Sequence, residues 1–389
     1  MGFADAARAE RLLLSGLGGT DLSGPGDGAE TVLTALAAAA DPDLALAGLA
    51  RVLEAAADPQ ALRRALGDEP DFRDRLTAVL GVSAGLADHL TRHPGDCQVL
   101  RGAVSRPGPW ELHQEMLRAV GANPRLAEPA AGQIPAGGRA PEPVDAAAAL
   151  AAAYRRRLLH LAARDLTGVA TVDEVGEELA DIAAAVLEAA LAVARSELSA
   201  GSAPARLAVV AMGKCGAREL NYASDVDVIF VAEPVSDEDE AEALATAGRL
   251  AAGMIGVCAR STPEGSIFPV DPNLRPEGRH GPLVRTLASH RAYYERWAKT
   301  WEFQALLKAR PVAGDTALGQ AYADMLAPLV WQAARREHFV EDTQAMRRRV
   351  EQSLPARQAG RELKLGPGGL RDIESVSYTH LTLPTTPYV

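Results

Sequence analysis

Cysteine, lysine and long apolar runs are scarce in this 389-residue sequence. The three cysteines, Cys97, Cys215 and Cys258, lie far apart, without the paired spacing of a zinc site or the even number of a disulfide framework. The N-terminus has only a three-leucine run and lacks the core of a signal peptide. The most apolar stretch, 182–194, is interrupted by Glu188 and is too short to span a bilayer. We therefore expect a protein of the reducing cytoplasm with no membrane segment.

Positive charge and aromatic side chains are also limited. The formal net charge is −11, and an acidic surface does not favour phosphate backbones, so a general nucleic-acid binder is not expected. Aromatic residues make up 4% of the chain whereas alanine and leucine are abundant, which favours helices over sheets. The length allows two or three domains. Against 36 arginines there are only four lysines, all in the half with the motifs below: Lys214, Lys299, Lys308 and Lys364.

Two aspartates stand in one of two short apolar runs near the middle of the chain. The runs, Leu207–Met212 and Val226–Val231, are rich in valine and bounded by glycine and proline, which favours buried strands. Asp225 and Asp227 alternate with valines, so both carboxylates leave the same face of the second strand. Unpaired buried charges cost roughly several kcal/mol, and a divalent cation would offset this cost. Carboxylate oxygens suit Mg²⁺, which also takes oxygens from substrate phosphates.

The turn between the two runs is predicted to bind phosphate. Gly213 and Gly216 let the backbone come close to a ligand and present N–H groups to phosphate, and Lys214 adds a positive charge. We expect one helical turn at Glu219–Asn221 before Ser224 leads into the second strand.

The run GKCGARELN, from Gly213 to Asn221, followed by SDVD at 224–227, resembles the nucleotidyltransferase superfamily. It more closely resembles the glutamine synthetase adenylyltransferase/adenylyl-removing enzymes. The resemblance spans about residues 70–374 and departs from the family at Cys215, where leucine is usual. It stops at Ser375, so the Thr- and Pro-rich tail 375–389 is predicted to be non-native.

The resemblance also implies the rest of the site. Asp271, on a third strand expected over Ser266–Leu274, would join Asp225 and Asp227 in holding two Mg²⁺ ions. The loop RPEGRHGP, which follows at once, supplies guanidinium groups suited to phosphate. The residues expected to bind nucleotide or phosphate are Gly213, Lys214, Gly216, Ser224, Arg275 and Arg279. Glu302, Lys308 and Arg310 are further candidates for ligand contact.

Enzymes of this family carry two nucleotidyltransferase domains that run opposite reactions on one tyrosine of glutamine synthetase. The N-terminal domain removes AMP with phosphate and releases ADP, and the C-terminal domain adds AMP from ATP. Asn221 and Glu277 are more similar to the N-terminal version, so the removing reaction is expected. The expected partners are glutamine synthetase and a PII-type nitrogen-signalling protein. Three alternatives stay open: the forward adenylyltransferase reaction, a uridylyltransferase acting on a signalling protein, and an inactive helical scaffold.

The expected fold class is α+β, a small mixed nucleotidyltransferase sheet with helices, flanked by all-helical segments. The predicted parts are a helical region 1–123, a flexible linker 124–144, helices over 145–200, the nucleotidyltransferase core 201–283, a helical domain 284–374 and the tail 375–389. An amphipathic helix is expected over 237–260, and a core helix covering the sheet over 283–315. His89 and His93 have a spacing that can bind metal, but without a further ligand we expect packing or surface roles.

Overall fold

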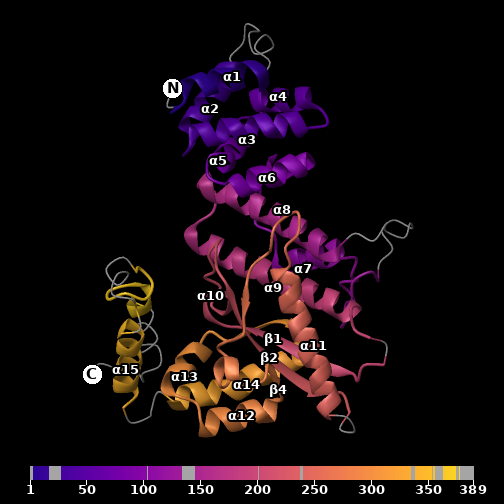
Figure 1. Ribbon diagram of the computed structural model, residues 1–389, viewed down its shortest axis with the longest axis vertical. Coiled ribbons are helices and arrows are strands. Elements are labelled where there is room, and N and C mark those ends of the chain that lie inside the picture. Colours follow the sequence, from indigo (N-terminus) through magenta and orange to yellow (C-terminus); the bar gives the residue numbers. More distant parts are fainter. Residues whose placement is uncertain are drawn as a thin grey trace.

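The computed structural model describes residues 3–16, 28–102, 104–133, 145–199, 201–236, 240–333, 338–352, 354, 362–373 and 376. The molecule is elongated, with a layer of short helices at one end and a small sheet covered by helices at the other (Figure 1). Two long helices join the two ends. This architecture confirms the predicted α+β class with helical segments on both sides of the sheet.

Capping side chains and prolines define where several N-terminal helices begin. Asp41, Asp58 and Ser83 each accept a hydrogen bond from the backbone N–H three residues further on. Proline follows the two aspartates at the first helical position, where no N–H is needed. The elements of this layer are α1 (Ala6–Gly16), α2 (Gly28–Ala38), α3 (Pro42–Ala55), α4 (Pro59–Asp68), α5 (Pro70–Leu80), α6 (Ala84–Arg92) and the 3-10 helix η1 (Pro94–Leu100). The next helix, α7 (Pro109–Ala119), lies outside the layer and packs against the two long helices that follow it.

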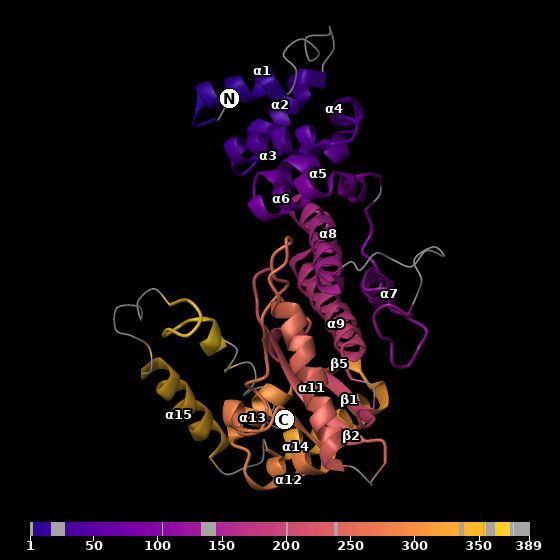
Figure 2. The ribbon, with the colours of Figure 1, turned by 45° about the vertical axis from the view of Figure 1, so that its right-hand side comes forward.

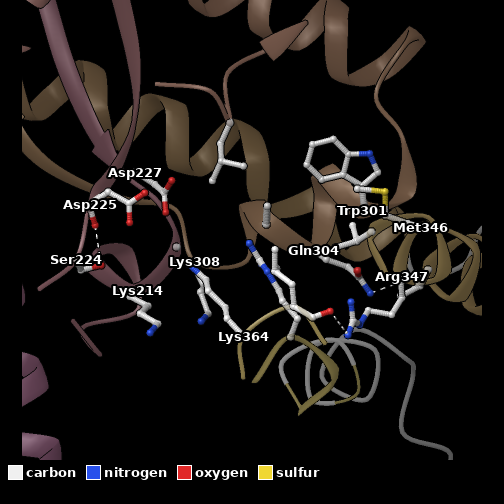
Figure 3. A pocket seen from close by; sticks show the side chains of 17 residues that line it. Lys214, Ser224, Asp225, Asp227, Trp301, Gln304, Lys308, Met346, Arg347 and Lys364 are labelled. Carbon is white, nitrogen blue, oxygen red and sulfur yellow. Dashed lines mark hydrogen bonds between the residues drawn. The ribbon is translucent and has the colours of Figure 1, made fainter. Parts of the chain in front are cut away.

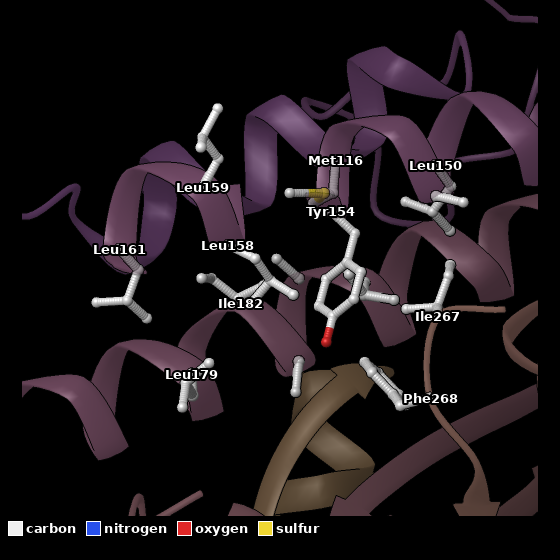
Figure 4. Close-up of a cluster of buried hydrophobic side chains, with 14 of the residues drawn as sticks. Met116, Leu150, Tyr154, Leu158, Leu159, Leu161, Leu179, Ile182, Ile267 and Phe268 are labelled. Carbon is white, nitrogen blue, oxygen red and sulfur yellow. The ribbon is translucent and has the colours of Figure 1, made fainter. Parts of the chain in front are cut away.

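The two long helices, α8 (Ala146–Leu166) and α9 (Val172–Ser196), confirm the pair predicted for this part of the chain. They run from the helical layer to the sheet (Figure 2). Their buried faces hold the segment that precedes the third strand, since the Tyr154 ring of α8 meets the Phe268 ring edge-on at 5.8 Å between centroids (Figure 4). This contact anchors the approach to Asp271.

In the described part of the chain the sheet has five strands, and both of the strands predicted at its centre are present. β1 (Ala205–Ala211) and β2 (Val226–Pro234) pair antiparallel, and β5 (Arg310–Gly314) lies antiparallel on the other side of β1. β3 (Val270–Asp271) and β4 (Val284–Arg285) both pair parallel with β2, at different points along it. The order is therefore β3-β2-β1-β5, with β4 also on β2.

Both faces of the sheet are buried, which explains why its central strands are continuously apolar. Side chains of β1 alternate between two cores, with Val209 in one and Val210 in the other. α9 and α11 (Glu240–Ala259) contribute to the first core, whereas α12 (Leu287–Arg296), α13 (Thr300–Leu306) and α14 (Thr316–Ala333) form the second with the sheet. α15 (Phe339–Gln352) packs against α13 and stands apart from the sheet (Figure 2).

Within the part of the chain that the structure describes, α11 is the one helix long and apolar enough, by length and composition, to cross a membrane. It packs against α9 and β2, and 44% of its most apolar window is buried. A core helix of a globular domain meets the same criterion.

Three local predictions were wrong. The helix expected over 283–315 is two short helices, α12 and α13, followed by strand β5, because Arg310–Gly314 finds a partner in β1. The third strand is confined to Val270–Asp271 instead of Ser266–Leu274. The helical turn expected at Glu219–Asn221 occurs earlier, as α10 (Gly213–Gly216), which Arg218 follows in the left-handed region at φ 60°.

Some predictions fall outside the described residues. These are the linker from 134 to 144, the acidic start of the 237–260 helix at 237–239, and the tail except Val376. The remaining domain boundaries stay predictions.

Candidate active site

Three carboxylates converge at one edge of the sheet. Asp227 on β2 and Asp271 on β3 are register partners in a parallel pair, and Asp225 immediately precedes β2. One carboxylate oxygen from each of the three lies within 4.8 Å of the others. Asp271 is held in place by the backbone N–H of Asn273, which donates to its Oδ1 at 2.7 Å. Residues 44 positions apart in the sequence are thus brought together by the pairing of β2 with β3.

The electrostatics of this cluster favour a bound cation. Burial, together with the neighbouring charges of Asp225 and Asp271, raises the pKa of Asp227 from 3.8 to about 6. The positive charges of Arg371 and Lys364 oppose this rise but do not cancel it. Three hard oxygen donors with uncompensated charge fit Mg²⁺ well.

Gly213 forms a tight bend against Asp227. Its φ is +52°, and a Cβ at this position would lie 2.4 Å from Asp227 Oδ2. The Met212 N–H donates to the Asp227 carbonyl at 2.8 Å, which continues the β1–β2 pairing to this point. Only glycine permits so close an approach of the bend to the carboxylate.

Gly216 has a different role from the one predicted. Its N–H donates to the Met212 carbonyl at 2.9 Å, and a Cβ here would lie 1.9 Å from the Lys308 carbonyl oxygen. Arg310 donates to the Cys215 and Gly216 carbonyls at 2.9 and 3.1 Å. Gly216 therefore lets α10 pack against the chain before β5, and its N–H does not face phosphate.

The arginine-containing loop also departs from expectation. The Arg275 guanidinium donates to the carbonyls of Pro272, Gly281 and Pro282 and so closes its own loop. Arg279 is exposed, and neither arginine lines the pocket beside the carboxylates. Glu302 is buried and accepts from the Lys299 N–H, so it does not reach that pocket either.

A pocket of about 350 Å³ opens beside the carboxylates (Figure 3). Of the predicted residues it brings together Gly213, Lys214, Ser224, Asp225, Asp227 and Lys308. The Ser224 hydroxyl donates to the Asp225 carbonyl at 2.8 Å. The remaining lining residues are Leu274, Trp301, Gln304, Ala305, Thr343, Met346, Arg347, Val350, Lys364, Leu365 and Arg371.

Sequence reasoning had missed the α13 and α15 side of this pocket. The glycine-rich segment 362–373 closes it, anchored by Arg347, which pairs with Asp372 and donates to the Leu365 and Gly366 carbonyls at 2.9 Å. One signal was present in the sequence. Three of the four lysines in the chain line this pocket: Lys214, Lys308 and Lys364.

A second group with metal-ligand geometry joins the helical layer to the segment that precedes β3. His89, His93 and Glu264 each place one donor atom within 4.8 Å of the others, so Glu264 is the further ligand that the two histidines lacked in the sequence. Glu264 is already paired with Arg92, whose Nε and Nη2 lie 2.9 and 3.1 Å from its two oxygens. His89 is fully buried, in line with the packing role expected, and the group acts as an ion-pair network.

Comparisons with known proteins agree on one family. The family model described as glutamate-ammonia ligase adenylyltransferase matches residues 73–325. The chain is 53% identical over 379 residues to a protein of Streptomyces avermitilis and 46% identical over 383 residues to one of Mycobacterium avium. Both relatives are named bifunctional glutamine synthetase adenylyltransferase/adenylyl-removing enzyme. In each case the match covers 96% of this chain and 35% of the relative, so the chain spans about a third of their length.

Proposed function

This chain belongs to the glutamate-ammonia ligase adenylyltransferase family, and we propose that it removes AMP from an adenylylated tyrosine of glutamine synthetase by phosphorolysis. The observation that carries the proposal is the convergence of Asp225, Asp227 and Asp271, the first two of which line a pocket that three lysines also line. Such a site brings two anions together, the adenylyl phosphate and the attacking inorganic phosphate, which would otherwise repel each other.

In the proposed reaction an oxygen of inorganic phosphate attacks the phosphorus of the tyrosine-bound AMP. The bond from phosphorus to the tyrosine oxygen breaks, and that oxygen leaves with the electron pair as a tyrosinate of glutamine synthetase. The products are ADP and, after the tyrosinate takes up a proton from solvent, the unmodified tyrosine side chain. Lys214, Lys308 and Lys364 hold the phosphates by charge. Mg²⁺ ions bound by the three aspartates would stabilise the charge that develops on the leaving oxygen.

The direction of the reaction rests on two residues. Asn221 and Glu277 resemble the AMP-removing version of the domain. Asn221 Oδ1 accepts a hydrogen bond from Lys214 Nζ at 3.0 Å, so it orients a lysine that meets the phosphates. Glu277 adopts φ 64° and pairs with Arg285, which shapes the loop after Asp271.

The forward reaction, transfer of AMP from ATP, is the second candidate, because the same pocket has the charge to hold a triphosphate and the relatives are named for both activities. Family membership supports a uridylyltransferase less well, and the convergent carboxylates argue against an inactive scaffold. A PII-type regulator is proposed from the resemblance alone, and a cytoplasmic location from the three scattered cysteines.

The test measures ADP release from adenylylated glutamine synthetase in the presence of Mg²⁺ and inorganic phosphate. The wild-type chain is expected to release ADP only when phosphate is present. The rate of ADP release should fall roughly 100-fold or more in the double variant Asp225→Asn/Asp227→Asn. Asp68→Asn, an exposed change in the helical layer, is the matched control and should retain activity. Unchanged ADP release by a well-folded double variant contradicts the proposal, and AMP transfer from ATP without phosphorolysis supports the forward reaction.

A further inference from the structure

The pocket changes character along its length (Figure 3). Asp225 and Asp227 lie at one end, lysine side chains occupy the middle, and Trp301 and Met346 lie at the other end. The first end comes from the sheet, whereas the last comes from α13 and α15. An anionic ligand with an apolar extension would match this order.

The middle section is built to bind more than one phosphate. Lys214 is positioned by Asn221, and Lys308 by an ion pair with Glu219. Lys364 lines the same cavity from the glycine-rich segment. In a chain that otherwise uses arginine for its positive charge, three lysines from three separate segments converge on one cavity. Their ammonium groups suit the scattered oxygens of a diphosphate.

The far end has the composition of a site for a planar base. Trp301 projects toward Met346 on α15, and Val350 and Leu365 complete the apolar wall. Gln304 and Thr343 lie in the same wall, 7% and 6% exposed, and the Gln304 amide donates to the Thr343 hydroxyl at 3.3 Å. A base that stacks on an indole also needs polar groups at its edge to be selected, and this wall offers both.

We infer that this pocket binds a purine nucleoside diphosphate with its base on Trp301 and its phosphates on the lysines, so that the diphosphate lies toward Asp225 and Asp227. The inference rests on the proposed function, whose product is ADP, and it assigns the base to α13 and α15. Trp301 is then a binding residue that selects the nucleotide, and Gln304 reads the edge of the base.

Trp297 provides a natural control for Trp301. It lies four residues earlier and is 73% exposed, outside the pocket. Titration calorimetry of the whole chain with Mg²⁺ would use two probes, ADP and inorganic pyrophosphate. Because base stacking on an aromatic side chain changes affinity by roughly tenfold or more, Trp301→Leu should lower the affinity for ADP about tenfold. Pyrophosphate, which has no base, should bind within about twofold of wild type.

Further variants distinguish the loss of base stacking from a loss of folding. Trp301→Phe preserves an aromatic face and should restore most of the ADP affinity, which a loss of folding would not allow. Lys364→Met should lower the affinity for both ADP and pyrophosphate, since it removes a phosphate contact. ADP should quench tryptophan fluorescence in wild type and in Trp297→Leu but not in Trp301→Leu. Three results would overturn the inference. They are an unchanged affinity for ADP in Trp301→Leu, an equal loss of affinity for ADP and pyrophosphate in that variant, and no ADP binding by the wild type.

Failure of the inference and failure of the proposed function give different results. If the chain releases ADP from adenylylated glutamine synthetase and Trp301→Leu binds ADP normally, the base lies elsewhere and the proposed function stands. If ADP binds in a Trp301-dependent way and no phosphorolysis occurs, the base site stands and the proposed reaction is wrong.

Discussion

Replacing Asp227 with asparagine should stabilise the metal-free protein while abolishing its proposed activity. In the fold, burial and the charges of Asp225 and Asp271 raise the Asp227 pKa to about 6 from 3.8. The folded state therefore holds this proton more tightly than the unfolded state. Stability falls as pH rises from about 4 to 6, and the cost persists at neutral pH.

The size of the effect follows from the pKa shift. At 1.36 kcal/mol per unit, a shift of about two units corresponds to about 3 kcal/mol, and partial solvent access reduces this to about 1–3 kcal/mol at pH 7.5. Asparagine has the same shape and no charge, so Asp227→Asn should gain this amount in the free energy of unfolding. At pH 4.5, where wild-type Asp227 is mostly protonated in the fold, the gain should shrink to about a third.

Urea unfolding in EDTA at pH 7.5 and 4.5 provides the assay, with Asp68→Asn as the control for a simple loss of surface charge. Added Mg²⁺ should reverse the order, since a cation that binds the native wild type stabilises it by mass action and the variant offers fewer ligands. An Asp227→Asn protein that is no more stable than wild type in EDTA at pH 7.5 would refute the electrostatic reasoning.

Three further predictions concern the surroundings of the site. Gly213→Ala places a Cβ against Asp227 at a positive φ, so phosphorolysis should fall at least about tenfold while circular dichroism stays native. Gly216→Ala should cost about 2–4 kcal/mol in thermal unfolding, because its Cβ meets the Lys308 carbonyl, and a wild-type melting temperature would argue against this packing. The Glu264 pKa is about 2 although burial alone would raise it, because Arg92, His93 and His89 hydrogen-bond the ionised form. Stability should therefore be lost as pH falls from about 4.5 to 2, and Glu264→Gln should flatten that part of the pH profile.

The order of polar and apolar residues along short segments was enough to predict the two central strands of the sheet. β1 and β2 alternate between two buried cores, and both were recognised from valine-rich runs. The paired carboxylates followed from the period of the second strand, and helices were expected over 145–200, where α8 and α9 lie. In each case neighbouring residues in the chain carry the signal, since strand and helix periods are local properties.

Long-range contacts decided the rest. β5 has little strand character of its own and exists because β1 has an open edge. Gly216 was expected to meet phosphate and instead meets the chain at Lys308, 92 positions away. Glu264 completes the His89 network from 175 positions away. None of these contacts can be predicted from the sequence separation of the two residues, because a long intervening chain does not fix the distance between them in the fold.

The sequence alone therefore determined which chemistry this protein carries: carboxylates on a strand, a glycine bend beside them and a small set of lysines. Only the tertiary structure decided where that chemistry operates, because it brought Asp271 beside Asp227, turned Arg275 back onto its own loop, and placed Trp301 opposite α15 as a wall of the pocket. The physical reason is that side-chain type and period are encoded locally, whereas the partner across a pocket depends on how distant helices and strands share a common core.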